Sequence, residues 1–324
     1  MIIWRSTETG FKITTKRPKP TSKATKTNEP RRRLLDGVEW ELIQPGSIVV
    51  RVPYEQNATW QQSCLLSSDR HWDNPHSDHE MQIRHLSEMI ERNAFCLDNG
   101  DLFCAMQGKY DKRSSKSDLR EEHKTGRYLD SLTETADVFF SPWANRFIMI
   151  GKGNHEESIS NNHETCLTER LISLLNQRGG SVINGGFGGF VKFSFRVNSP
   201  GGAGSYRDVV LHYDHGYGGG GPVTRDMIQH QRRQVYLPDA DIIMSGHTHD
   251  QWSYWCSRVR LNQVGKIHHD EVLHVKTPTY KEEYGTGSGG WHSRRGSPPK
   301  PIGAYWLNFK YRNNRIVFDV ERAV

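Results

Sequence analysis

Cysteines are few in this sequence, and no two of them are spaced as a metal-binding or redox pair. The 324 residues contain five cysteines without a C-x-x-C motif: Cys64, Cys96, Cys104, Cys166 and Cys256. Scattered cysteines of this kind argue against a thiolate zinc site and against a disulfide framework. We interpret most of them as buried thiols.

Long apolar runs are also missing. The longest are of strand length, far below the roughly 20 residues that a membrane-spanning helix needs. The first twelve residues, MIIWRSTETGFK, have neither a continuous apolar core nor a small-residue cleavage site, which argues against a secretory signal. We therefore expect an intracellular, cytoplasmic protein that does not associate with a membrane.

The excess of positive charge is confined to the N-terminal segment. The chain carries a net charge of +6, and residues 1–33 hold ten basic and two acidic side chains. The remaining residues hold 33 basic and 35 acidic side chains, a net charge of −2. The segment is rich in Pro, Thr and Lys, so we expect a disordered tail over 1–35 and a single folded domain over 36–324. The tail is either a solvated leader or an electrostatic tether to nucleic acid.

Short apolar runs alternate with stretches of helical spacing. Strands are predicted in 63–71, 94–101, 146–156, 208–216 and 240–249, and helices in 79–93, 125–140 and 166–180. This alternation predicts an α/β fold with layered sheets. Beyond residue 251 the pattern favours antiparallel strands, including a hairpin that turns at Asn313-Asn314. The expected architecture is two packed sheets with helices outside.

Each of the five apolar runs ends in Asp, Asn or His. The strand ends read Asp69-Arg70-His71, Gly100-Asp101, Gly153-Asn154-His155-Glu156, His212-Tyr213-Asp214-His215 and Gly246-His247-Thr248-His249. Since the ends of strands in an α/β sheet converge on one crevice, side chains distant in sequence can meet there.

The mixture of carboxylate, amide and imidazole groups suits manganese, iron, zinc or nickel. Asp101 is the candidate to bridge two ions, because the adjacent glycine lets its backbone approach the site. Taken singly, His247 and His249 read as two solvated histidines, and Asn154 reads as a helix cap. The ordered series of motifs favours a metal site instead.

This series resembles the calcineurin-like metallophosphoesterase superfamily, whose pattern is D-x-H, G-D, G-N-H-D/E, H and G-H-x-H. The resemblance covers roughly residues 60–277 and is to the compact prokaryotic and phage-type members. It implies a four-layer αββα sandwich, in which two mixed sheets are flanked by helices. It also implies a protein of prokaryotic or phage origin.

The resemblance implies roles for particular residues. One metal would be held by Asp69, His71 and His249, with Asp101 bridging to the other. The second metal would be held by Asn154, His247 and a histidine of the segment 208–216. We favour His215 over His212 for that position, because His215 precedes the glycine run 216–221. His155 would be a non-ligand histidine beside the scissile phosphate.

The implied activity is hydrolysis of a phosphoester by a dinuclear metal site. Two divalent ions, with manganese preferred over iron, zinc or nickel, would generate a bridging hydroxide for in-line attack on phosphorus. His155 would protonate the leaving group or stabilise the phosphoryl oxygens. The family often has a second acid soon after G-D, and here Cys104 stands at that place, a departure that bears on the substrate subclass and not on the metal ligands.

A phosphodiester or nucleic-acid substrate is favoured over a small-molecule or protein phosphomonoester. The reasons are the basic tail and two segments, 106–120 and 285–301, which carry Arg, Lys and Trp side chains. Each segment is alternatively a plain surface loop. An alternative of another class is a nucleic-acid-binding or virion-associated protein that keeps the metals for structure alone.

Overall fold

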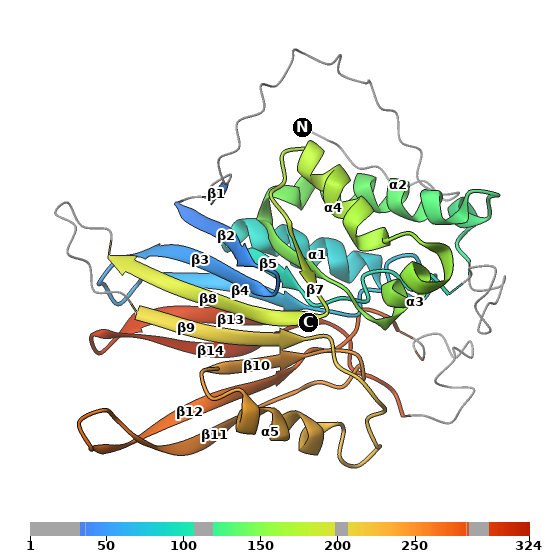
Figure 1. The fold of residues 1–324 in the computed structure, drawn as a ribbon. Helices are drawn as coiled ribbons and strands as arrows, with labels where there is room; N and C mark the ends of the chain where they lie inside the picture. The colour runs from blue at the N-terminus through green and yellow to red at the C-terminus, as the bar shows by residue number, and fades with distance from the viewer. Residues whose placement is uncertain (1–32, 36, 107–118, 198–206, 283, 285–297) are drawn as a thin grey trace. The chain divides into compact units, whose positions relative to one another are not determined.

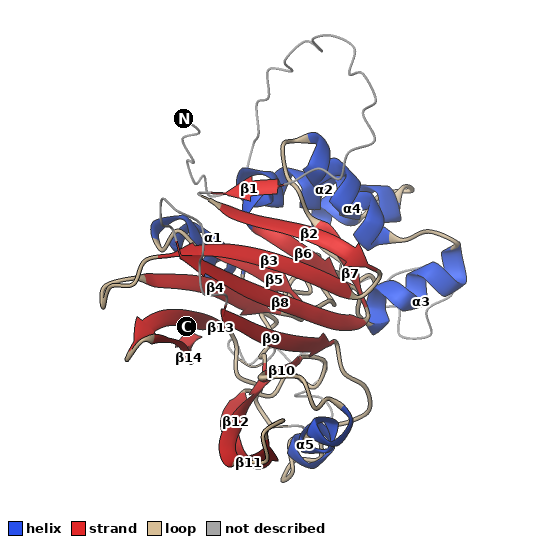
Figure 2. Ribbon diagram, turned by 60° about the vertical axis from the view of Figure 1, so that its left-hand side comes forward, coloured by secondary structure: helices blue, strands red, loops and turns tan. Residues whose placement is uncertain are grey.

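Two β-sheets pack face to face in the computed structural model (Figures 1 and 2). The structure describes residues 33–35, 37–106, 119–197, 207–282, 284 and 298–324. One sheet has eight strands in the order β1-β2-β3-β8-β9-β10-β12-β11. Its strands are β1 Arg33–Leu35, β2 Val38–Gln44, β3 Ser47–Tyr54, β8 Gly188–Val197, β9 Arg207–Asp214, β10 Ile242–Ser245, β11 Trp252–Leu261 and β12 Ile267–Lys276.

The second sheet has six strands in the order β14-β13-β4-β5-β6-β7. Its strands are β4 Gln61–Ser67, β5 Phe95–Asp98, β6 Phe147–Gly151, β7 Ile183–Gly186, β13 Ala304–Arg312 and β14 Arg315–Ala323. The strands β4, β5, β6 and β7 are parallel, whereas β13 pairs antiparallel with both β4 and β14. Both sheets are therefore mixed, because β9, β10 and β12 also pair in parallel within the larger one.

The principal apolar core lies between the sheets. It combines Val50, Phe193 and Leu211 of the eight-stranded sheet with Leu66 and Phe309 of the six-stranded sheet, all at most 1 % exposed. In β3 the buried positions alternate, as in a strand with one face on the core, whereas β4 and β13 are buried at almost every position. Packing two such faces together removes both from water and fixes the relative positions of the strand ends.

Helices cover the outer faces. The helices α1 His79–Glu91, α2 Tyr128–Phe140 and α4 Leu167–Gln177 bury an apolar stripe against the six-stranded sheet. The helix α5 Met227–Tyr236 lies beside β10 and β12 of the other sheet (Figure 1), where Leu237 and Ala240 after it pack on Ile243 and Val272. The helix α3 Asn154–His163 follows β6. The predicted αββα sandwich is confirmed.

The predicted hairpin turn is confirmed, whereas the predicted boundary of the tail differs in detail. The hairpin of β13 and β14 turns at Asn313 and Asn314, whose φ values of 49° and 58° suit a type I′ turn. Residues 33–35, assigned to the tail by the sequence, pair as β1 with β2. The rest of the tail lies outside the described residues.

Within the described part of the chain, no helix is both long and apolar enough to cross a membrane.

Candidate metal centre

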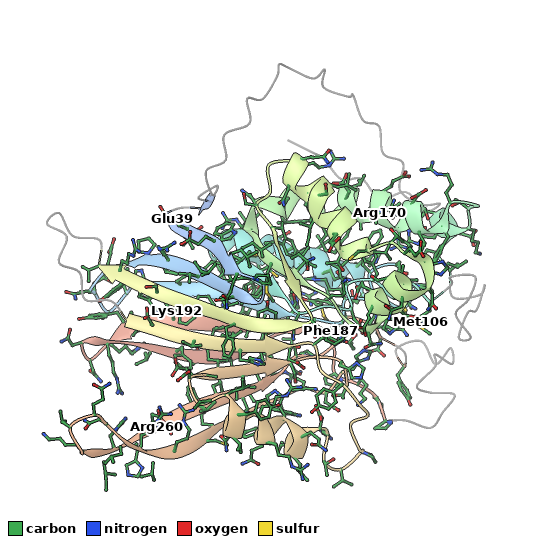
Figure 3. All side chains as sticks on the ribbon, in the orientation of Figure 1. Glu39, Met106, Arg170, Phe187, Lys192 and Arg260 are labelled. Carbon is green, nitrogen blue, oxygen red and sulfur yellow. The ribbon has the colours of Figure 1, made fainter. Side chains whose placement is uncertain are left out.

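The residues with metal-binding side chains follow the carboxyl ends of five strands. Asp69 and His71 follow β4, Asp101 follows β5, Asn154 and His155 follow β6, His215 follows β9, and His247 and His249 follow β10. Three of these strands belong to the six-stranded sheet and two to the eight-stranded sheet. The centre therefore lies where the ends of the two facing sheets meet, and not within the crevice of a single sheet. Phe187 and Met106, labelled in Figure 3, lie on this side of the molecule.

A first group of side chains consists of Asp69, His71 and His249. The Nε2 atom of His249 lies 3.1 Å from His71 Nε2 and 3.3 Å from Asp69 Oδ1. Asp69 and His71 are at most 1 % exposed. A carboxylate oxygen and two imidazole nitrogens thus point at one another in a place that water hardly reaches.

A second group consists of Asp101, His215 and His247. His215 Nε2 lies 3.1 Å from Asp101 Oδ2, and His247 Nδ1 lies 2.7 Å from Asn154 Oδ1. Asn154 therefore joins this group through its amide oxygen. The backbone N–H of His247 donates to Asp69 Oδ2 at 3.0 Å, which connects the second group to the first.

His215, and not His212, belongs to the second group. The ring of His212 lies 4.9 Å from the ring of Phe190, and its Nδ1 atom is buried without a hydrogen-bond partner among the described residues. His212 lies inside β9, whereas His215 follows its end, where the chain turns toward Asp101.

The second nitrogen of two of these histidines is held by a backbone carbonyl. His215 Nδ1 donates to Asn99 O at 2.8 Å, and His247 Nε2 donates to Gly218 O at 2.9 Å. Each bond fixes the orientation of the ring, so the other nitrogen faces the remaining side chains of the group. Asn99 and Gly218 act through carbonyl oxygens, which any residue possesses, so sequence reasoning had no signal for them.

The backbone is in the left-handed region at five of the predicted ligand positions. The φ values are 51° at Asp69, 43° at His71, 50° at Asp101, 73° at His247 and 57° at His249. This conformation costs an L-residue roughly 1–2 kcal/mol. Its concentration around one point indicates that the surrounding structure holds these side chains in place for a function.

Two motif glycines leave room for the carboxylates. A Cβ atom at Gly153 would lie 2.0 Å from Asp101 Oδ1, and one at Gly246 would lie 2.5 Å from Asp69 Oδ2. No side chain fits at those distances. The glycines of G-N-H-E and G-H-T-H are therefore required so that two loops can close directly over the two acids.

The donor atoms fit a bound cation. Asp69 Oδ1 and His215 Nε2 are buried without a hydrogen-bond partner among the described residues, although His249 Nε2 and Asp101 Oδ2 lie 3.3 and 3.1 Å from them. Atoms that point at a common space without bonding one another are the arrangement that ligands of an ion adopt. Oxygen and imidazole donors suit divalent transition metals.

Burial and mutual charge shift the pKa values of these groups. Burial raises the pKa of Asp101, but the charges of His215 and His155 outweigh it and lower that pKa below its usual range. Burial lowers the pKa of His215 and His155, but the Asp101 carboxylate raises each to about 10. The buried Asp101 carboxylate is thus kept ionised by neighbouring positive charge.

His155 lies beside both groups. Its Nδ1 donates to the carbonyl oxygen of Cys104 at 2.6 Å, and its Nε2 lies 3.8 Å from Asp101 Oδ2. Cys104, which stands where the family often has an acid, is buried, and its Sγ atom lies 3.4 Å from Asn74 Nδ2. One ring nitrogen each of His71 and His155 and the Cys104 Sγ atom lie within 4.8 Å of one another.

Glu156 ties two of the ligand loops together. Its carboxylate accepts from the N–H groups of Asp101, Phe103 and Gly153 at 3.2, 2.8 and 2.9 Å. Burial, and then the charge of Asp101, raise its pKa to about 7. In the sequence Glu156 is recognisable only as the D/E position of the motif. Its bracing role could not be predicted, because its partners are backbone N–H groups, which every residue except proline has.

Arg70 supports the centre from behind. It lies between Asp69 and His71 in the sequence, is fully buried, and donates to Asp98 Oδ2 at 2.6 Å. Its guanidinium also lies 4.8 Å from the centroid of the Tyr280 ring. The pair joins the loop after β4 to the end of β5, which leads to Asp101.

Replacing Arg70 with leucine is expected to destabilise the fold by about 3–5 kcal/mol, because Asp98 would remain buried without its partner. Urea denaturation would measure the change. Arg127→Ala is the matched control, since Arg127 pairs with Asp130 and Glu134 on an exposed face of the structure. A loss for Arg70→Leu no larger than for this control would contradict the supporting role.

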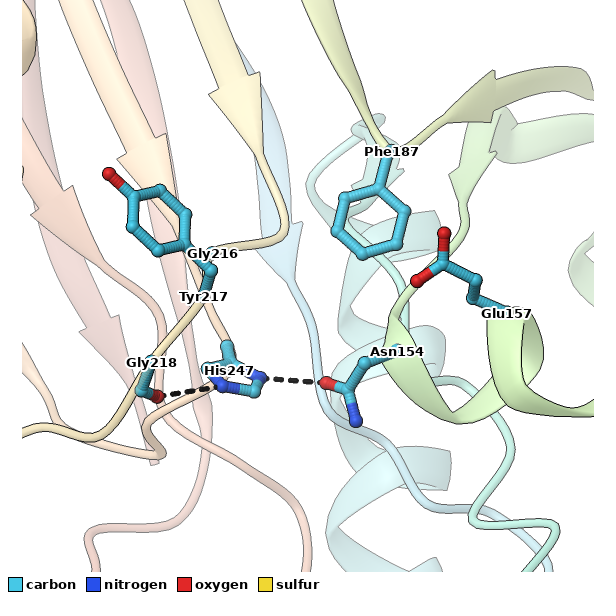
Figure 4. A pocket seen from close by; sticks show the side chains of 7 residues that line it. All are labelled: Asn154, Glu157, Phe187, Gly216, Tyr217, Gly218 and His247. Carbon is cyan, nitrogen blue, oxygen red and sulfur yellow. Dashed lines mark hydrogen bonds between the residues drawn. The ribbon is translucent and has the colours of Figure 1, made fainter.

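A pocket opens beside the second group (Figure 4). Its volume is about 360 Å³, and its lining is formed by Asn154, Glu157, Phe187, Gly216, Tyr217, Gly218 and His247. Asn154 and His247 lie at one side of it, with His247 Nδ1 2.7 Å from Asn154 Oδ1, and the rings of Phe187 and Tyr217 lie apart across the opening (Figure 4). Sequence reasoning missed both aromatic residues.

The two predicted substrate-binding segments lie largely outside the described residues. These are 107–118 of the basic segment and 285–297 of the Arg- and Trp-bearing segment. Arg120, at the end of the first, is described: it pairs with Glu122 at 2.6 Å and lies over the Trp72 ring, 5.2 Å from its centroid.

Comparison with known proteins gives only distant likenesses. No protein-family model and no curated protein matches the chain. Similar solved structures include a predicted phosphoesterase from Streptococcus pneumoniae, with 11% identity, coverage of 82% of this chain and 92% of that chain, and a TM-score of 0.31. Vacuolar protein sorting 29 from Cryptosporidium parvum has 12% identity, coverage of 82% and 98%, and a TM-score of 0.30. Wild-type Vps29 from Entamoeba histolytica, complexed with zinc, has 10% identity, coverage of 81% and 99%, and a TM-score of 0.26.

Likenesses this distant assign no function. The chain resembles the calcineurin-like metallophosphoesterases in the order of its motifs, in its two facing mixed sheets and in the meeting of those motifs at one centre.

Proposed function

We propose that the chain is a phosphoester hydrolase that uses two divalent metal ions. One observation carries the proposal: two groups of metal-binding side chains lie side by side, and a histidine outside both groups, His155, lies next to them. A site that binds metals only for stability has no need of that histidine.

The proposed ligands follow the two groups. Asp69, His71 and His249 would hold one ion, and Asn154, His215 and His247 the other. Asp101 would serve both ions. Its carboxylate lies in the second group, and that group adjoins the first, because the N–H of His247 donates to Asp69 Oδ2.

Divalent ions in such a site supply a hydroxide at neutral pH and neutralise the charge of the phosphoryl oxygens. Manganese is our first choice, with iron, zinc or nickel as alternatives, because the donors are oxygen and imidazole nitrogen. The chain itself excludes water around the buried acids, so charge interactions there are stronger than at the surface.

His155 is proposed to act on the leaving group. Because Nδ1 donates to Cys104 O, Nε2 is the nitrogen that can donate a proton to a substrate oxygen. The side chain is 13 % exposed, which leaves it open to a bound ester, whereas Asp101 is 2 % exposed. These positions suit a general acid.

A phosphodiester is the proposed substrate class. The pocket beside Asn154 and His247 has two aromatic walls, and no Lys or Arg is among the described residues that line it. A diester carries one negative charge and an additional organic group, whereas a monoester carries up to two charges and needs more compensation. A nucleic-acid substrate would also give the basic segment 1–33 a partner.

Turnover of bis(p-nitrophenyl) phosphate and of p-nitrophenyl phosphate with added manganese tests the proposal. We expect hydrolysis of both, with the higher kcat/KM for the diester, and loss of both activities with EDTA. A higher kcat/KM for the monoester would overturn the diester preference. Hydrolysis of neither substrate with manganese, iron, zinc or nickel would overturn the enzymatic function and favour structural metals.

A further inference from the structure

The pocket beside the metal centre has features that identify what it accepts. Its volume of about 360 Å³ lies at the lower end of the range for small-molecule sites, roughly 300–1,000 Å³. Asn154 and His247 belong to its lining, so a group in the pocket lies directly beside the second group of ligands. A substrate whose phosphorus lies at the metals would thus place one of its ester groups here.

The aromatic walls are anchored to the centre. The Phe187 carbonyl accepts from the N–H of His215 at 2.9 Å, and the Phe187 ring lies edge-on to the His215 ring at 6.0 Å. Phe187 therefore keeps a fixed position relative to a proposed ligand.

The Tyr217 ring has a guanidinium group over it. The guanidinium of Arg233 lies 5.7 Å from the centroid of the Tyr217 ring and is paired with Asp214 Oδ1 at 2.9 Å. The flanking Gly216 and Gly218 have φ values of 108° and 79°, which lets this loop approach the His247 ring. Tyr217 remains 63 % exposed, an unusual exposure for a ring that is positioned in this way.

The charge of the lining excludes one kind of ligand and favours another. Without a described Lys or Arg, the pocket offers nothing to a second phosphate group. Glu157, at the rim opposite Tyr217 in Figure 4, presents a carboxylate that accepts hydrogen bonds from N–H groups. A planar ring with N–H donors on its edge, as in guanine, can stack on the aromatic side chains and donate hydrogen bonds to the Glu157 carboxylate.

We infer that the pocket between Phe187 and Tyr217 binds the nucleobase of a nucleotide ester whose phosphate lies at the metal centre, an inference that rests on the proposed function. Stacking of a base on an aromatic side chain contributes about 1–3 kcal/mol, or roughly 5- to 150-fold in affinity. The base therefore adds measurably to the affinity of the phosphate alone.

Isothermal titration calorimetry of the manganese-loaded full chain tests the inference with two ligands that differ only in the base. We expect guanosine 5′-monophosphate to bind at least about tenfold more tightly than ribose 5-phosphate. Phe187→Leu and Tyr217→Leu should each reduce that ratio to about threefold or less. Trp255→Leu is the control, since Trp255 is 45 % exposed and its ring lies 5.3 Å from the ring of Phe318, outside the pocket. It should leave the ratio unchanged.

Equal affinity for the two ligands, binding of neither, or a ratio that survives both aromatic substitutions would overturn the base-binding pocket. The measurement needs no catalysis, so it separates the two proposals. A tenfold ratio in a protein that hydrolyses no phosphoester would uphold the pocket and overturn the proposed function. Hydrolysis of bis(p-nitrophenyl) phosphate with a ratio near one would do the reverse.

Discussion

Asp101→Asn is expected to lose bound metal and at least about a thousandfold in kcat/KM for a phosphodiester. Asparagine keeps the size of the side chain and removes its charge, so the backbone N–H of His155 can still donate to Oδ1. What is lost is the negative charge placed 3.1 Å from His215 Nε2. A metal site contributes several kcal/mol of transition-state stabilisation, and each 1.36 kcal/mol is tenfold in rate.

Metal content after dialysis, measured by inductively coupled plasma mass spectrometry, would fall from two ions per chain toward one or none. Asp130→Asn is the matched control, because Asp130 lies on the exposed face of α2 and pairs with Arg127 and Arg170. If Asp101→Asn keeps two ions per chain, Asp101 is not a ligand shared by the two metals. Circular dichroism would establish that the variant still folds.

The strands that carry the centre could be predicted from the sequence, because each is a short apolar run followed by chemically distinctive residues. Their division between two sheets could not be predicted. The runs that become β6 and β10 have the same pattern, four or five buried residues, yet they belong to different sheets. The pairing of the strands depends on how they pack across the core, and the sequence of a single strand does not reveal this packing.

Some residues of the site could likewise be predicted from the sequence, and others could not. His215 could be preferred over His212 on the sequence, since a glycine run follows it, and the structure brings His215 to Asp101. Phe187 and Tyr217 could not be found, because an isolated aromatic residue in a loop has no spacing to mark it. Arg70 stood inside a motif, but its partner Asp98 is recognisable only after the strands β4 and β5 pair.

His155→Ala is expected to keep both metals and to lose about 10²- to 10⁴-fold in kcat on a phosphodiester with an alkoxide leaving group. The reason is that His155 lies outside the two groups of proposed ligands, with Nε2 3.8 Å from Asp101 Oδ2. A general acid matters most when the leaving group is a strong base, because a weakly basic group departs without a proton. The loss on bis(p-nitrophenyl) phosphate should therefore be much smaller than on a dinucleotide.

That difference between leaving groups separates proton donation from mere positioning of the centre. Loss of a positioning residue would slow both substrates to a similar extent, and it would also lower the metal content. His163→Ala is a matched control, since His163 ends the ten-residue helix α3 that Asn154 begins and so lies about 13 Å along the helix from Asn154. Equal losses of kcat on the two substrates would overturn the role of His155 as a general acid while leaving its place beside the metals intact.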